Sequence, residues 1–173
     1  MFRLLVVLSV LSVLSACVHA NDMSISGVGG SATPIKGEDS SVVMSTETVS
    51  LELYKDHYET IVCFIFKNEG KAKTVTMGFP ERGFGIDGGD AKASISHFRS
   101  YVDGIPVETK RVVSQHNQDD YVAYWTKTVP FQRNQSHKVI VHFSSPYGGG
   151  IGGTSVGYDF TGGNWKGKVQ ASS

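Results

Sequence analysis

Hydrophobic and polar residues alternate along several stretches of this chain, a period of two that is typical of β-strands with one buried face. The alternation is clear in residues 46–53, 74–79 and 138–143. Residues 58–67 are instead apolar on both faces in their middle, which predicts a central strand. We expect a core built on Val49, Leu51, Ile61, Val62, Phe64, Phe66, Val75, Val139, Val141 and Phe143.

Turn signals separate these stretches. Residues 68–71 predict a turn in which Gly70 supplies a positive φ. Pro80 is expected to end the strand before it, because proline cannot donate to a ladder. Residues 94–102 and 105–113 predict a hairpin, since the Asp103-Gly104 pair between them is a strong two-residue turn signal.

The first strand of that hairpin carries an irregularity. Its apolar positions change parity between Ile95 and Phe98, which predicts a bulge near Ser96 and His97. Further strand candidates are residues 121–129, 156–160 and 165–169.

No stretch of the chain shows a helical period over ten or more residues. Short strands with turn signals about every 8–12 residues indicate an all-β fold, an antiparallel β-sandwich. We expect a signal peptide over residues 1–20, an extended leader over 21–41 and the sandwich domain over 42–173.

The first twenty residues have the order of a secretory signal. Arg3 supplies the positive charge, an apolar run follows from Leu4 to Leu14, and Ala20 offers a small residue for cleavage. The apolar run is about half the ~20 residues that a membrane-spanning helix needs, and no later segment is longer. We therefore expect an exported bacterial protein, periplasmic or extracellular, whose mature chain has no transmembrane helix.

The sequence allows two alternative cleavage sites. Cleavage after Ala20 would release a mature chain that begins at Asn21. Residues 14–17 also match a lipobox, in which Cys17 would be acylated and would anchor a lipoprotein to the membrane.

Composition narrows the classes of function. The 16 Lys and Arg residues balance the 16 Asp and Glu residues, so no net field attracts nucleic acid. Cys63 lies in an apolar run and is expected to be a buried, inert thiol.

Motifs for catalysis and cofactors are weak. Residues 83–88 match G-x-G-x-x-G, but the pattern lacks the strand–turn–helix context of a dinucleotide site. Loop acids such as Asp87 and Asp90 have no EF-hand spacing, and the histidines form no metal-ligand motif. We therefore expect no cofactor, no metal and no catalytic residue.

Three functions follow from these features, in order of preference. The first is a non-enzymatic exported domain that binds an envelope protein or another ligand. The second is a carbohydrate-binding module that uses loop aromatics, of which Tyr147 is the best candidate for an exposed ring. The third is a hydrolase of unknown type. We take Tyr147, Asp87 and Asp90 as candidate ligand-contacting loop residues.

Several sequence blocks resemble an uncharacterised family of exported bacterial β-rich proteins, a domain of unknown function. The most specific block is residues 161–167, Thr-Gly-Gly-Asn-Trp-Lys-Gly. A weaker similarity is to the N-terminal domain of inter-α-trypsin inhibitor heavy chains. The other blocks of the first resemblance are residues 21–22, 29–30, 43–47, 66–68, 78–80, 124–126, 129–131 and 145–148.

The resemblance implies export and a β-rich fold, and no catalytic residue carries over from it. Members of the similar family continue beyond the block at residues 161–167. We therefore expect that the sandwich lacks one or more C-terminal strands and that an unpaired edge strand promotes self-association.

Overall fold

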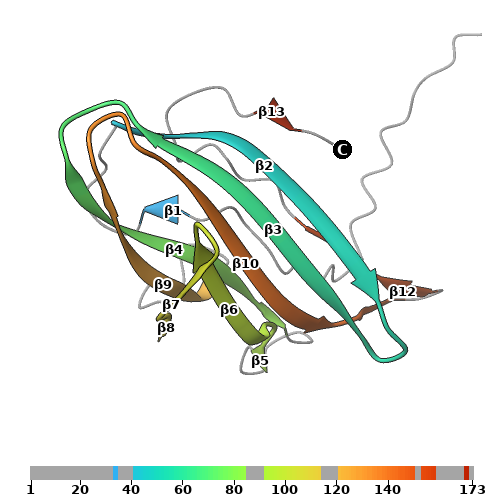
Figure 1. The fold of residues 1–173 in the computed structure, drawn as a ribbon. Coiled ribbons are helices and arrows are strands. Elements are labelled where there is room, and N and C mark those ends of the chain that lie inside the picture. The colour runs from blue at the N-terminus through green and yellow to red at the C-terminus, as the bar shows by residue number, and fades with distance from the viewer. Residues whose placement is uncertain are drawn as a thin grey trace, which may run out of the picture.

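The structure is a computed structural model of the 173-residue chain, and it describes residues 33–34, 41–84, 92–113, 121–150, 153–158 and 170–171. The described residues form strands and turns without a helix, which confirms the predicted all-β, antiparallel sandwich (Figure 1). The strands are β1 (Thr33–Pro34), β2 (Val42–Leu53), β3 (His57–Asn68), β4 (Lys73–Phe84), β5 (Lys92–Ala93), β6 (Ser96–Val102), β7 (Ile105–Val107), β8 (Lys110–Val113), β9 (Tyr121–Phe131), β10 (Ser136–Pro146), β11 (Gly148–Gly150), β12 (Gly153–Ser155) and β13 (Gln170–Ala171).

The strands form two main sheets. The five-stranded sheet has the order β1-β4-β9-β8, with β5 also paired to β4. The six-stranded sheet has the order β13-β2-β3-β10-β6-β7, and β11 and β12 form a small hairpin. The short connections at residues 69–72 and 132–135 carry β3 into β4 and β9 into β10, so both connections pass from one sheet to the other.

The core lies between the two main sheets. Even-numbered residues of β3 point inward, and the fully buried side chains include several large aromatic rings. Phe79 of the five-stranded sheet meets Phe98 and Phe143 of the six-stranded sheet at centroid distances of 5.6 and 5.2 Å. These contacts join the sheets without a disulfide among the described residues.

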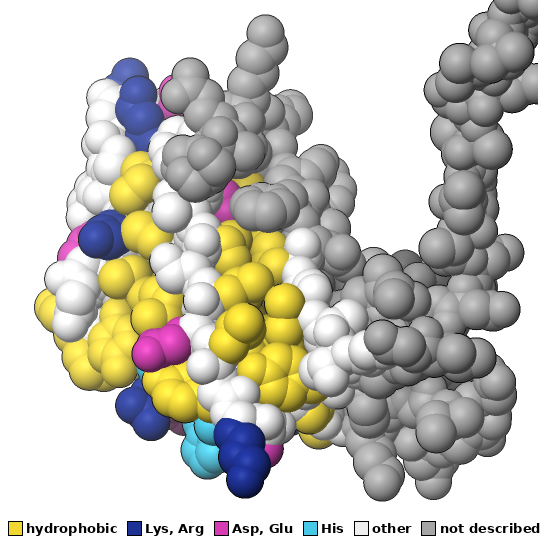
Figure 2. Space-filling view, turned by 90° about the vertical axis from the view of Figure 1, so that its right-hand side faces the viewer, with side chains coloured by type: hydrophobic (Ala, Val, Ile, Leu, Met, Phe, Trp, Pro, Cys, Tyr) yellow, Lys and Arg dark blue, Asp and Glu magenta, His cyan; other side chains and the backbone are white. Residues whose placement is uncertain are grey.

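The prediction that Ile61 and Leu51 are core residues is wrong. Ile61 is 40% exposed because it lies on the outer face of β3, opposite Ser50 and His142. Leu51 points to the core side, but it lies near the end of a strand at the rim of the sheet and is 41% exposed. Figure 2 views the molecule from the right-hand side of Figure 1 and shows hydrophobic side chains at the surface, beside polar and charged ones.

The predicted bulge and hairpin are confirmed. The β6–β10 register shifts between His142 and Ser144, and His97 takes a φ of 52° at that point. Asp103 and Gly104 form the two-residue turn between β6 and β7 with φ values of 51° and 83°, as a type I′ turn requires.

The predicted single strand over residues 105–113 is wrong. It breaks at residues 108–109 into β7, which belongs to the six-stranded sheet, and β8, which belongs to the five-stranded sheet. Similarly, the candidate at residues 156–160 is not a strand over 156–158, and residues 159–160 and 165–169 lie outside the described residues.

Pro80 does not end its strand, contrary to expectation. It lies inside β4, where β1 pairs with Met77 and Gly78 and β5 pairs with Gly83 and Phe84. At Pro80 itself, no described strand pairs with the edge of β4 that carries β1 and β5. The missing N–H of Pro80 therefore costs no hydrogen bond along that edge.

Gly70 does not have the expected positive φ either. A Cβ at this position would lie 2.6 Å from the Cβ of Ser41, so a close approach of the chain explains the glycine.

Among the described residues, the structure contains no helix that is long and apolar enough to cross a membrane.

Candidate functional site

A polar groove lies on the outer face of the six-stranded sheet, away from the core. Its volume is about 260 Å³, and three neighbouring strands supply its walls. It is lined by His57, Glu59, His97, Arg99, His142 and Ser144.

Strand register brings these side chains together. His57 and Glu59 are odd-numbered residues of β3 and point away from the core. Across the ladders, Glu59 pairs with Ser144 of β10, and His142 of β10 pairs with Arg99 of β6. Because opposite residues in an antiparallel pair share a face, the three strands place their polar groups side by side.

The bulge in β6 shapes one wall of the groove. His97 occupies the left-handed region at φ 52°, which non-glycine residues rarely adopt. Backbone strain of this kind costs on the order of 1–3 kcal/mol and is found most often at functional sites. A second hollow of about 260 Å³ continues from the groove and shares His57, His97 and Ser144 with it.

Charge in the groove is unevenly paired. The Glu59 carboxylate lies 3.0 Å from Nε2 of His142, and the Asp56 carboxylate lies 2.7 Å from Nδ1 of His57. Within the described part of the chain, neither the Arg99 guanidinium nor the His97 ring has a hydrogen bond or an ion pair. Both acids are therefore engaged, while one permanent cation and one imidazole remain available.

Across the described ranges, no three His, Cys, Asp or Glu side chains are placed to hold a metal ion. The groove offers hydrogen-bond donors: a guanidinium, the Ser144 hydroxyl and imidazole ring nitrogens.

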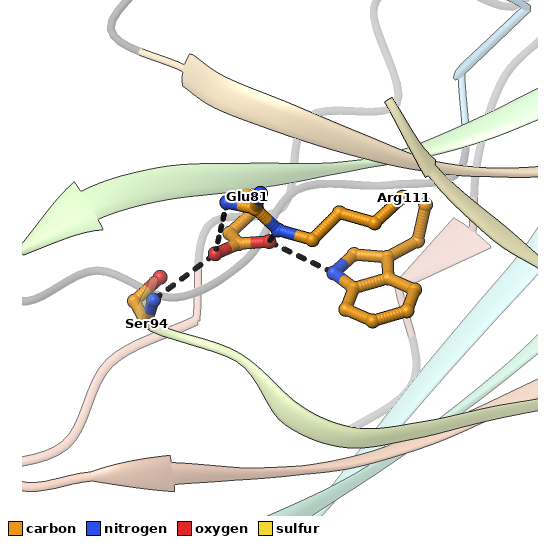
Figure 3. Close-up of polar contacts among 4 residues, drawn as sticks. Glu81, Ser94 and Arg111 are labelled. Atoms are coloured by element: carbon orange, nitrogen blue, oxygen red, sulfur yellow. Dashed lines mark hydrogen bonds and ion pairs between the residues drawn. The ribbon is translucent and has the colours of Figure 1, made fainter. Parts of the chain in front are cut away.

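A second polar cluster lies inside the fold, around the buried carboxylate of Glu81 (Figure 3). Arg111 donates to it through Nε at 2.8 Å and through a terminal nitrogen at 3.2 Å. The Trp125 indole donates at 2.9 Å and the Ser94 backbone N–H at 3.1 Å. The hydrogen bonds to Glu81, and then its negative charge, raise the pKa of the Arg111 guanidinium.

With four donors, the Glu81 carboxylate has its hydrogen-bonding capacity largely filled. The cluster ties β4, β8, β9 and the segment before β6 together, which is a structural role.

Of the loop residues expected to contact a ligand, Tyr147 lies within the described part of the chain, and it does not line the groove. Tyr147 is half-buried against the core, and its hydroxyl donates to the Tyr54 carbonyl at 2.6 Å. Its ring also packs against Tyr58, at a centroid distance of 5.8 Å. Asp87, Asp90 and Cys17 lie outside the described residues.

Sequence reasoning missed the groove because its residues are far apart in the chain. Residues 57–59 and 97–99 do carry a signal, since each segment repeats a polar pair at i and i+2 within a strand. Such a pair is typical of any solvent-facing side of a strand, and only the register joins the two segments into one groove.

Comparisons with known proteins show likeness of fold. No family model matches the chain, and no curated protein matches it. The structure is similar to the crystal structure of a protein of Legionella pneumophila described as a "putative nutrient binding protein", with a TM-score of 0.66 and 20% sequence identity. The similarity covers 85% of this chain and 52% of that one, so this chain spans about half the length of its neighbour.

Proposed function

We propose that this protein is an exported, non-enzymatic binding domain that holds a small anionic ligand in the groove on the outer face of its six-stranded sheet. The Arg99 guanidinium carries this proposal, because it has no partner among the described residues and lines a concave site whose two neighbouring acids each contact a histidine. A guanidinium offers a rigid fork of donors that suits the carboxylate or phosphate group of a ligand.

The neighbouring side chains supply further donors. Ser144 contributes a hydroxyl, and His97 contributes a ring nitrogen from the strained bulge. These groups can donate hydrogen bonds to the oxygens of an anion beside the Arg99 guanidinium.

The structural neighbour supports a binding role. It is described as a nutrient binding protein, although the description is itself marked as putative. Export is part of the same proposal, because the sequence starts with the pattern of a secretory signal.

Calorimetric titration tests the proposal with named probes. The chain is titrated at one fixed pH with acetate, succinate, citrate and inorganic phosphate, and with glucose as a neutral ligand. We expect at least one anion to bind. Arg99→Gln should weaken that binding by about tenfold or more, which corresponds to about 1.4 kcal/mol.

Arg133→Gln is the matched control, because Arg133 is an exposed arginine in the turn between β9 and β10, outside the groove lining. This variant should bind like the original chain. Anion binding that survives Arg99→Gln, or binding of glucose alone, would contradict the proposal. The second result would favour the carbohydrate-binding alternative.

A further inference from the structure

We infer that two copies of this chain pair edge to edge through residues 49–53 of β2, in an antiparallel ladder centred on Leu51. β2 is a 12-residue strand at the rim of the six-stranded sheet. On its outer edge, β13 pairs with Thr46 and Glu47. Among the described residues, no strand lies against residues 49–53 on that side.

This stretch has little of the protection that edge strands normally carry. Lysine, proline and bulges usually block pairing with a second chain. Residues 49–53 contain one charge, at Glu52, and no proline or lysine, and the irregularity of β2 lies earlier, between Met44 and Thr46. Leu51 and Leu53 are also exposed beside this open edge, Leu53 by 63%.

The sequence of the stretch is complementary to itself about Leu51. In an antiparallel pair, opposite residues point to the same face. Leu51 would meet Leu51 of the second copy, and Val49 would meet Leu53 of the second copy, all on the core-facing side. On the outer side, Ser50 would meet Glu52 of the second copy, so no like charges would lie opposite each other.

Other registers are less favourable. Pairing centred on Glu52 would place two carboxylates opposite each other, which is destabilising. Pairing centred on Ser50 would extend to Thr48, next to the edge that β13 covers. The register about Leu51 also fits the uncovered length, because it uses five residues and stops short of Glu47 in both copies.

Such a dimer would join two six-stranded sheets into one continuous sheet. The dimer would not cover the polar groove, since the groove lies on β3, β10 and β6. The chain has no net charge, so long-range repulsion does not oppose the association. The pairing is independent of the proposed ligand.

Disulfide trapping tests the pairing and its register together. Cys17 and Cys63 are first replaced by serine, and a single cysteine is then placed at position 51 or at position 53. Leu51→Cys should form a disulfide-linked dimer under mild oxidation, because the two thiols would lie directly opposite each other. Leu53→Cys should cross-link at least tenfold more slowly, since its opposite residue would be Val49.

Sedimentation of the purified chain over a range of concentrations provides the second measurement. We expect a reversible monomer–dimer equilibrium that Leu51→Lys shifts to monomer, because it places two ammonium groups opposite each other. Ile105→Lys is the control, since Ile105 is a more exposed apolar residue on β7, at the other edge of the sheet. A monomer at every concentration, or equal cross-linking at positions 51 and 53, would overturn the inference.

Discussion

Lys127 lies directly opposite Met77 in the β4–β9 ladder, on the face of the five-stranded sheet that packs into the core. Its side chain is 3% exposed, and its Nζ has no hydrogen-bond partner in the described structure. Burial alone lowers the pKa of Lys127 to about 8. The fold therefore holds an ammonium group in an environment that favours its neutral form.

We expect Lys127→Met to stabilise the protein. The shift from the ordinary pKa corresponds to about 3 kcal/mol of unfavourable free energy when the lysine is charged in both states. Methionine has a similar length and shape and no charge to bury. Chemical denaturation at pH 7 should show a gain of about 1–3 kcal/mol.

The pH dependence gives a second readout of the same lysine. Between the folded pKa of about 8 and the unfolded pKa of about 10.5, the unfolded chain binds more protons than the folded one. The stability of the original chain should therefore rise with pH across this window, and the rise should be absent in Lys127→Met. Lys138→Met serves as a control on an exposed lysine of β10. A stability loss in Lys127→Met would indicate that the ammonium has a favourable partner.

Two substitutions on β3 test where the core lies. Phe64 is fully buried, so Phe64→Ala should cost about 3–5 kcal/mol through lost transfer energy and a cavity. Ile61→Ala, three residues earlier on the outer face, should cost less than about 1 kcal/mol, because the side chain is already partly in water. Urea denaturation measures both, and equal losses would mean that the two faces of β3 are assigned wrongly.

Local patterns were enough to predict much of the fold. The period of two identified the inward rows of β4 and β10, and the change of parity before Phe98 located the bulge. Asp103-Gly104 identified its own turn, because only residues that tolerate a positive φ fit it. These features depend on neighbours in the sequence.

Features that depend on contacts between distant segments could not be predicted in this way. The turn signal at Asp103-Gly104 predicts a hairpin but does not locate the end of its second strand, so the break at residues 108–109, where the chain passes from one sheet to the other, could not be predicted. The exposure of Leu51 depends on its place at the rim of the sheet, and Pro80 is tolerated because of gaps on the far edge of β4. The groove requires the β3–β10–β6 order, which places Arg99 beside His142.

Export can be tested through Cys17. If the lipobox is used, Cys17→Ser should release the protein from membranes and abolish labelling by a fatty-acid analogue. If cleavage instead follows Ala20, intact mass should place the N-terminus at Asn21, and the substitution should change neither result. Uncleaved protein in the cytoplasm would refute both routes.

Glu81→Ala should be among the most destabilising single changes outside the apolar core. It removes the acceptor that holds the Arg111 guanidinium and the Trp125 indole, and it opens a space where four donors converge. Breaking a buried ion pair by removing one partner typically costs about 3–5 kcal/mol. The expected loss is near the lower end, because the Arg111 side chain is 32% exposed and water can solvate its free guanidinium.

Arg111→Ala leaves the opposite defect, a buried carboxylate that retains the Trp125 and Ser94 donors but loses its counter-charge. We expect this variant to lose more stability than Glu81→Ala, since Glu81 has no exposed surface through which water could compensate. Glu108→Ala is the control, because the Glu108–Lys110 pair is highly exposed and its removal should change stability by less than about 0.5 kcal/mol. Denaturation of the three variants in parallel measures the ranking, and a loss in Arg111→Ala as small as that in Glu108→Ala would show that the cluster does not brace the five-stranded sheet.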